Sequence, residues 1–248
     1  MKFGGASVAR PELFSLVADK IIEKQKEYDQ VTVVVSAMGN TTNQLLDLAR
    51  QVHESPPRRE LDMLISVGER VSIALLAMAL ASKGKQAVSL TGSQSGIITS
   101  CEHAEAKIID VRPRRILTHL QEGKVVIVAG FQGVSESGEI TTLGRGGSDT
   151  SAVALGVALG ADKVEFFKDV EGVYAEDPKV NPKAVHYPKL DYEQALTIIQ
   201  KGAKILHEWA VKLACKNALP LRVLSFLKET DGTWIASRQE EKRQKSYE

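Results

Sequence analysis

The sequence has few cysteines and almost no net charge, and each shortage argues against a class of protein. Its 248 residues contain two cysteines, Cys101 and Cys215, with no Cys or His nearby at the spacing of metal ligands. A disulfide framework and a zinc site are therefore not expected, and we predict two inert, partly buried thiols. The formal net charge of +1 gives no reason to expect nucleic acid or a membrane surface as a partner.

Long apolar runs and a signal peptide are also missing. The longest apolar stretches, at residues 71–81 and 125–129, are shorter than the roughly 20 residues that a helix needs to cross a bilayer. The first residues lack the basic and apolar regions of a signal peptide. We therefore expect no transmembrane segment and a cytoplasmic location.

What the sequence does contain is a regular alternation of helical and strand patterns. Apolar residues recur at helical spacing from Pro11, and residues 31–35 form a short β-branched run. The same pattern predicts helices near residues 43–52, 59–81, 149–159, 192–199 and 204–216, and strands near residues 87–90, 125–129, 164–167 and 221–224. Strands separated by helices favour one α/β domain with a mainly parallel sheet covered on both faces. The charged tail at residues 237–248 has nothing to bury, and we expect it to be frayed.

Three turns rich in glycine or small residues each follow an apolar run, at residues 4–7, 36–39 and 144–149. In a parallel sheet such turns meet at the carboxyl ends of the strands, where backbone N–H groups and a helix N-terminus attract an anion. A single Gly-Gly is more often an ordinary tight turn, but three, each beside Lys, Arg or a hydroxyl, favour a phosphate site. The P-loop pattern and the dinucleotide fingerprint are both missing.

Seven short segments, in the usual order, resemble the signatures of the aspartokinase family. They read KFGGASV (2–8), SAMGNTT (36–42), GER (68–70), GFQG (130–133), TLGRGGSDT (142–150), DVEGVY (169–174) and GAKILH (202–207). The resemblance spans roughly residues 2–235, nearly the whole chain. One such segment would be a weak signal, but seven in order are specific.

The resemblance implies the amino-acid-kinase fold, a three-layer αβα sandwich around a mainly parallel sheet. The amino-acid substrate would bind an N-terminal lobe at about residues 1–150, and the nucleotide a C-terminal lobe at about residues 151–236. The implied reaction transfers the γ-phosphoryl group of ATP to the β-carboxylate of L-aspartate, on the route to lysine, threonine and methionine. Mg²⁺ would be held mainly by the nucleotide phosphates, with no protein ligand assigned, and a homodimer is possible by analogy with the family.

The implied catalytic residues are Lys2 on the transferring phosphoryl group, Asp149 orienting that lysine, and Lys204 near the phosphates. Without the Gly-Gly that follows it, Lys2 would be interpreted as a solvated surface charge. Asp149 begins the helix after the glycine turn, where a short carboxylate is an ordinary N-cap, and the two roles are compatible. The attacking carboxylate is already ionised, so no general base is expected.

The amino-acid pocket needs a cation for the α-carboxylate and an anion for the ammonium. Arg145 suits the first need because a guanidinium binds a carboxylate bidentately, and Glu69 suits the second. The resemblance assigns them these roles, with further hydrogen bonds from Ser36, Thr42 and Ser148. The plain alternative for Glu69 is a solvated helix charge, but its apolar surroundings favour a buried, paired carboxylate.

The nucleotide is expected to contact two groups of residues. The first group surrounds the phosphates and consists of Gly4, Gly5, Ser7, Gly146, Gly147 and Lys204. The second lies around the adenine and ribose and consists of Lys168, Asp169, Tyr174 and Lys179. A turn at Asp177-Pro178 explains much of that second segment without any ligand.

The sequence departs from the family pattern at a few places. Lys168 and Ala6 stand where the family usually has Thr, and Glu208 stands where Pro is common. Only Met1 precedes Lys2, so the first strand is expected to be cut short. The family's C-terminal regulatory domains are not in this sequence, and we expect a catalytic domain that lysine and threonine do not inhibit.

Two other classes of function remain open at this point. One is a sister kinase of the same fold that acts on acetylglutamate, glutamate, carbamate or a nucleoside monophosphate. Glu69 argues against an acylated or phosphorylated substrate, because its charge suits a free ammonium. The other is a nucleotide- or amino-acid-binding protein without turnover, which the presence of Lys2, Arg145 and Lys204 disfavours.

Overall fold

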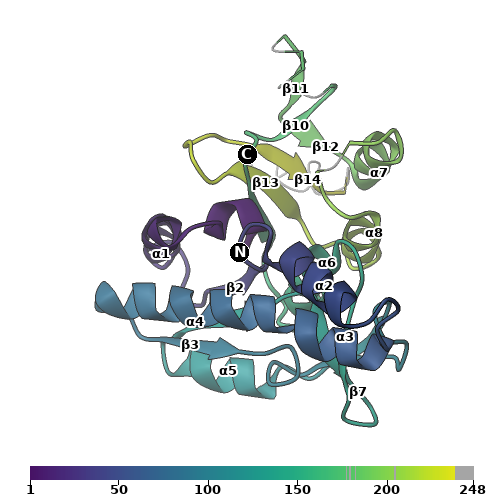
Figure 1. Cartoon of the computed structure of the whole chain (residues 1–248). Helices are drawn as coiled ribbons and strands as arrows, with labels where there is room; N and C mark the ends of the chain where they lie inside the picture. Colours follow the sequence, from purple (N-terminus) through teal and green to yellow (C-terminus); the bar gives the residue numbers. More distant parts are fainter. Residues whose placement is uncertain (177, 179, 182, 204, 238–248) are drawn as a thin grey trace.

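A central eight-stranded sheet organises the chain in the computed structural model, which describes residues 1–237 apart from 177, 179, 182 and 204 (Figure 1). The strand order is β12-β14-β13-β9-β1-β2-β6-β3. The strands are β1 (Lys2–Phe3), β2 (Thr32–Val35), β3 (Ala87–Leu90), β6 (Val125–Ala129), β9 (Val164–Lys168), β12 (Lys189–Leu190), β13 (Leu221–Ser225) and β14 (Thr233–Ile235). Among the described residues of this sheet, only β13 and β14 pair antiparallel, so the predicted mainly parallel sheet is confirmed.

Helices cover both faces of the sheet, which gives the predicted three layers. One face packs on α1 (Pro11–Lys24) and α4 (Val67–Ser82), and the other on α5 (Arg114–Gln121), α6 (Gly147–Ala158), α7 (Tyr192–Gln200) and α8 (Glu208–Lys216). Strand β2 illustrates the division, because Val33 and Val35 belong to the first core and Val34 to the second. Strands buried on both faces become nearly continuous apolar runs, and this is why the sequence pattern located them.

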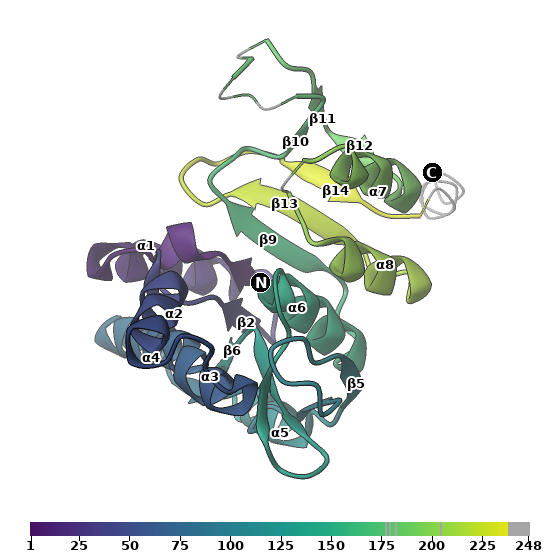
Figure 2. The same cartoon turned by 45° about the vertical axis from the view of Figure 1, so that its right-hand side comes forward.

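A second, smaller sheet was not predicted from the sequence. It has the order β5-β4-β7-β8 and consists of β4 (Ile97–Thr99), β5 (Ile108–Val111), β7 (Gln132–Ser135) and β8 (Ile140–Thr142). Its strands are short and only partly apolar, so their alternation is too brief to stand out. A separate hairpin of β10 (Val173–Tyr174) and β11 (His186–Tyr187) projects from the end of the molecule near β14 (Figures 1 and 2).

The long helix predicted at residues 59–81 is in fact two helices, α3 (Arg58–Ile65) and α4, separated at Ser66. The backbone carbonyl of Ser66 accepts a hydrogen bond from Gln132 Nε2 at 2.8 Å, so the break is tied to the smaller sheet. The helix predicted at residues 204–216 begins only at Glu208. The expectation of partly buried thiols is wrong, because Cys101 and Cys215 are both exposed.

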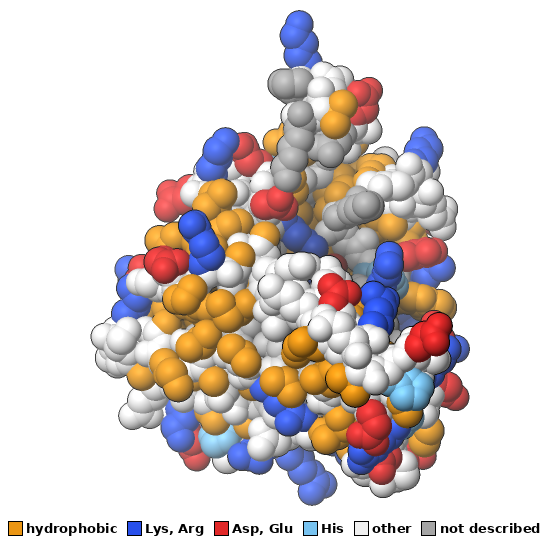
Figure 3. Space-filling view, viewed as in Figure 1, with side chains coloured by type: hydrophobic (Ala, Val, Ile, Leu, Met, Phe, Trp, Pro, Cys, Tyr) orange, Lys and Arg blue, Asp and Glu red, His pale blue; other side chains and the backbone are white. Residues whose placement is uncertain are grey.

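The stretch Arg58–Ser82 is, by length and composition alone, able to cross a membrane. A count of consecutive apolar residues missed this property because charged residues interrupt the stretch. One side of α4 packs into the core through Ile73, Leu76 and Leu80, which is what the core helix of a globular domain does. The other side leaves Met78 65% exposed, and hydrophobic side chains gather on the surface over α4 (Figure 3).

Core packing of α4 can be tested with two truncations on the same helix. Leu76 is fully buried, so Leu76→Ala should lower the free energy of unfolding by about 2 to 5 kcal/mol. Met78→Ala is the control, and we expect a change within about 0.5 kcal/mol because its side chain is mostly in solvent. Urea unfolding of both variants measures the difference, and equal losses would contradict this packing.

Candidate active site

The candidate site lies at the carboxyl ends of β2, β1 and β9, in the middle of the large sheet (Figure 2). The chain passes from β1 to β2 on one side and later returns to β9 on the other side of β1. Ligands bind at such a reversal of strand order in open α/β sheets. The segments at residues 4–7 and 36–39 directly follow β1 and β2, and Lys168 ends β9, so the fold gathers these predicted elements here.

A buried cluster of charges occupies the centre of this site. Lys2 is only 4% exposed, and its Nζ lies 2.6 Å from Oδ1 of Asp149. The Nζ of Lys168 lies 3.4 Å from the other carboxylate oxygen, Oδ2. Burial alone would raise the pKa of the Asp149 carboxyl, but the two ammonium groups outweigh it and hold that pKa below its usual value. Two cations on one carboxylate leave a net positive charge, and a bound anion would offset it.

Asp149 reaches Lys2 from inside α6 and not from its N-cap, so that part of the prediction is wrong. The N-cap is Gly146, and Asp149 is the third residue of the helix. Gly146 has φ of +72°, and a Cβ there would lie 2.2 Å from the ring of His207. Only glycine meets both conditions. The first turn of α6 therefore brings its positive end and Asp149 to the same place.

Glu69 is a second buried carboxylate beside the same lysine. It lies in the first turn of α4, is 3% exposed, and its Oε1 accepts a hydrogen bond from the Ala37 N–H at 3.0 Å. Burial raises the pKa of Glu69 to about 7, although that hydrogen bond and the charge of Lys2 oppose the rise. Its Oε2 is buried and has no hydrogen-bond partner among the described residues, so the carboxylate is able to accept a further donor.

Helix α4 can approach the turn after β2 closely because residue 68 is glycine and has no side chain. A Cβ on Gly68 would lie 2.8 Å from the Cβ of Ala37. Gly68 therefore lets Glu69 reach the Ala37 N–H, which gives a physical reason for the Gly-Glu pair. Ser36 directly follows β2, and Thr42 is the second residue of α2 (Thr41–Val52). The threonine side chain next to this contact is that of Thr41, whose Cγ2 would lie 3.6 Å from a Cβ on Gly68.

Arg145 lies in the loop between β8 and α6, and its side chain is exposed. Within the described part of the chain, no hydrogen bond or ion pair engages its guanidinium, so it is available to a ligand. Ser148, the second residue of α6, packs closely against Gly130, where a Cβ would lie 2.8 Å from the Ser148 Cβ. This glycine belongs to the GFQG segment and lets the loop approach β6.

The residues expected around the nucleotide divide into those that the structure describes and those outside it. The Nζ of Lys2 lies near Gly4, and Gly5 packs against the Ala37 carbonyl, 3.0 Å from where a Cβ would be. Ser7 is buried, and its hydroxyl donates to the Phe167 carbonyl at 3.4 Å. Asp169 and Tyr174 follow β9, and Gly147 begins α6. Lys179 and Lys204 lie outside the described residues.

The profile of the family described as "Amino acid kinase family" matches residues 1–225. The chain belongs to this family. The chain is 51% identical over 235 residues to the aspartokinase of Mycolicibacterium smegmatis, a match that covers 94% of the chain and 56% of that relative. It therefore spans little more than half the length of such a relative.

Solved structures resemble this amino acid kinase over almost its whole length. The crystal structure of aspartate kinase from Synechocystis has 45% identity and a TM-score of 0.85, with 95% of this chain and 39% of that chain covered. Aspartokinase III from E. coli, solved in complex with aspartate and ADP, has 26% identity and a TM-score of 0.86, with 95% and 64% covered. The predicted amino-acid-kinase fold is thereby confirmed.

Sequence reasoning missed two histidines beside the site. His207 packs against Gly146, and its buried Nδ1 has no hydrogen-bond partner within the described chain. His186 on β11 packs its ring 5.0 Å from that of Tyr174. His207 ends the GAKILH segment, which could have drawn attention to it, whereas His186 belongs to no motif and only the hairpin brings it near Tyr174.

A cavity of about 200 Å³ lies elsewhere in this amino acid kinase and is not the candidate site. Met1, Thr32 and Glu165 are among its lining residues. These residues belong to the opposite, amino-terminal ends of the parallel strands. Ligands of open α/β sheets bind outside the carboxyl ends, so the charged cluster around Lys2 remains the candidate.

The raised pKa of Glu69 makes a prediction about stability. The folded protein binds this proton more tightly than the unfolded chain, whose pKa is about 4.5. The resulting stabilisation is complete below about pH 4.5 and is lost as the pH rises through about 7, with a total loss of roughly 3 kcal/mol. Relative to Glu69→Gln, wild-type stability in urea unfolding should therefore fall between pH 5 and pH 8. Parallel pH curves would contradict the raised pKa.

Proposed function

We propose that this amino acid kinase transfers the γ-phosphoryl group of ATP to the β-carboxylate of L-aspartate and forms β-aspartyl phosphate. The observation that carries the proposal is the buried Oε2 of Glu69, which has no hydrogen-bond partner among the described residues and lies beside a cationic cluster. A free ammonium group is the partner that this atom lacks. Relatives about half identical to the chain are named aspartokinases, which supports aspartate as the amino acid.

Different residues of the site bind the amino acid and assist the phosphoryl transfer. Glu69 accepts the ammonium of the substrate, and Arg145 binds its α-carboxylate bidentately, so the β-carboxylate is directed toward Lys2. Lys2 and Lys168 offset the negative charge of the phosphates, and Asp149 holds both lysines in place. The β-carboxylate is already ionised and attacks the γ-phosphorus directly, with ADP as the leaving group. Lys204 is proposed to add a further cation near the phosphates.

Mg²⁺ is expected to enter with ATP. No group of three His, Cys, Asp or Glu side chains suited to a metal ion exists in the described part of the chain. Coordination by phosphate oxygens and water is therefore the arrangement that fits these residues. When bound, the ion would neutralise part of the negative charge of the phosphates.

The two halves of the sheet suggest where each substrate binds. The half formed by β2, β6 and β3 carries Glu69 through α4, and we assign the amino acid to it. The half formed by β9 and β13 carries Lys168 and leads to Tyr174, and we assign the nucleotide to it. A homodimer remains an expectation from the family.

The alternative is a sister kinase that acts on acetylglutamate, glutamate or a nucleoside monophosphate. An acylated or phosphorylated substrate has no free ammonium and would leave Glu69 Oε2 buried and unpaired, which costs about 1 to 3 kcal/mol. Glutamate has a free ammonium, and only the assay below distinguishes it from aspartate. A binding protein without turnover would have no need of the two lysines on Asp149. A single assay distinguishes the proposed function from both alternatives.

That assay traps acyl phosphate with hydroxylamine in the presence of ATP and Mg²⁺. L-aspartate is compared with glutamate, N-acetylglutamate and UMP, and ADP release is followed in parallel. We expect hydroxamate with aspartate alone. ADP release with another acceptor would assign the chain to a sister kinase, and no reaction with any acceptor would favour a binding protein.

Lys2→Ala tests the proposed charge on the transferring group. We expect turnover to fall by about two to three orders of magnitude, because a transition-state charge contact is lost, while aspartate affinity changes little. Lys85→Ala, an exposed lysine after α4, is the control. Steady-state kinetics measure both variants, and an unchanged rate in Lys2→Ala would remove Lys2 from the mechanism.

A further inference from the structure

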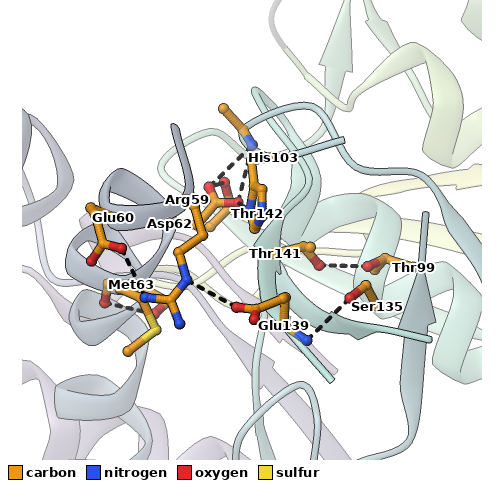
Figure 4. Close-up of polar contacts among 12 residues, drawn as sticks. Arg59, Glu60, Asp62, Met63, Thr99, His103, Ser135, Glu139, Thr141 and Thr142 are labelled. Atoms are coloured by element: carbon orange, nitrogen blue, oxygen red, sulfur yellow. Dashed lines mark hydrogen bonds and ion pairs between the residues drawn. The ribbon is translucent and has the colours of Figure 1, made fainter. Parts of the chain in front are cut away.

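Asp62 is a fully buried carboxylate that the proposed reaction does not use. It lies on α3, is 0% exposed, and accepts hydrogen bonds from three residues (Figure 4). Thr142 Oγ1 donates to its Oδ1 at 2.5 Å, His103 Nδ1 lies 2.8 Å from its Oδ2, and the Ala104 N–H donates to both oxygens at 3.1 Å. A buried carboxylate satisfied in this way is costly to disturb.

The donors to Asp62 border the loop that carries Arg145. Thr142 ends β8, three residues before Arg145. Ala104 touches the same loop from the other side, since a Cβ on Gly144 would lie 3.2 Å from the Ala104 carbonyl oxygen. The N–H of Ala106 also donates to the Thr142 carbonyl at 3.0 Å. Asp62 is therefore hydrogen-bonded to both segments that border the start of the Arg145 loop, at Thr142 and at Ala104.

Ala104 adopts a backbone conformation that needs such support. Its φ is +72°, in the left-handed region that a residue with a Cβ seldom occupies. The hydrogen bonds from its N–H to Asp62 offset the cost of this conformation. Strain of this kind persists only where the surroundings impose it, and it clusters at functional sites.

Asp62 on α3 and Glu69 in the first turn of α4 lie on two consecutive helices joined at Ser66. Helix α3 ends at Ile65, Ser66 is tied to Gln132, and α4 then brings Glu69 to the Ala37 N–H. Asp62 and Glu69 are seven residues apart. One short segment thus contains the proposed ammonium acceptor and, through the buried Asp62, is hydrogen-bonded to the base of the Arg145 loop.

We propose that Asp62 is a positioning residue that keeps the Arg145 loop in register with Glu69, so that the α-carboxylate and the ammonium of the amino acid are met at a fixed spacing. The assignment of those two groups rests on the proposed function. Among the described residues, the hydrogen bonds of Asp62 go to Thr142, His103 and Ala104 and not to Lys168 or Tyr174 on the nucleotide side. Gly146 and Gly147, expected at the phosphates, follow the same loop, so Asp62 should affect amino-acid binding more strongly than nucleotide binding.

Asp62→Asn is the variant that tests this role. Asparagine has the same shape, but an NH₂ group replaces one of the two acceptor oxygens of Asp62. The donors that now bond to that oxygen would then face another donor. Calorimetry should show aspartate affinity weakened by at least about tenfold and ADP affinity weakened by no more than about threefold, a split that general loss of folding would not produce. Hydrogen exchange of the amides at residues 143–147 should become at least about tenfold faster.

The matched control is Arg59→Gln on the same helix. Arg59 joins α3 to the smaller sheet through Glu139 at 2.9 Å, but this ion pair is exposed (Figure 4), and such pairs contribute little. We expect aspartate affinity, ADP affinity and loop exchange to stay at wild-type values. If Asp62→Asn fails to fold by circular dichroism, Thr142→Val removes one donor and should give the same split in smaller degree.

Two results would overturn the proposal. One is a parallel loss of aspartate and ADP affinity in Asp62→Asn, and the other is unchanged exchange at residues 143–147 in both variants that perturb Asp62. If wild type binds ADP but no aspartate, the proposed function fails instead. The exchange measurement then still decides whether Asp62 holds the loop.

Discussion

The burial of Lys2 against Asp149 is the constraint on which the rest of the site depends. Strand β1 contains only Lys2 and Phe3, yet it lies between β2 and β9 at the centre of the sheet. Phe3 is fully buried and stacks on Phe167, with 4.6 Å between the ring centres. A lysine in this position would be prohibitively costly without a partner, and α6 supplies that partner as Asp149.

Two carboxylates therefore flank one ammonium group and acquire opposite properties. Asp149 has two lysine partners, and its pKa is held below the usual range, so it stays ionised at neutral pH. Glu69 has one backbone N–H and a desolvated pocket, and its pKa rises to about 7. Groups whose environments separate their pKa values in this way take different roles. Here Asp149 is a permanent counter-ion, and Glu69 becomes fully charged when a cation arrives.

The sequence predicted those parts of the fold that depend on local pattern. Buried parallel strands such as β6 and β9 are largely apolar on both faces, and turns rich in glycine or small residues mark the carboxyl ends of β1 and β2. The smaller sheet was not predicted, because its strands of three or four residues show no clear alternation. The break at Ser66 was missed for another reason, since a contact with Gln132, distant in sequence, stabilises it.

The candidate site also contains residues that the sequence predicted and residues that depend on contacts distant in sequence. Lys2 and Asp149 are motif residues, and the family resemblance predicted that they pair. Lys168 belongs to none of the motif segments and was expected around the adenine and ribose, so its contact with Asp149 was not predicted. Asp62 belongs to no motif, and its role depends on donors that lie 41 to 80 residues further along the chain. Long-range hydrogen bonds of this kind leave no periodic signal in a single sequence.

The most direct test of the account is the proton balance of aspartate binding. With a pKa raised to about 7, a substantial fraction of the Glu69 side chains carries a proton at pH 7, and a bound ammonium favours the charged form. Calorimetry of L-aspartate binding at pH 7, in buffers that differ in ionisation enthalpy, should therefore show proton release in wild type that is lost in Glu69→Gln. Aspartate binding without proton release, or with the same release in the variant, would contradict the assignment of Glu69 as the ammonium acceptor.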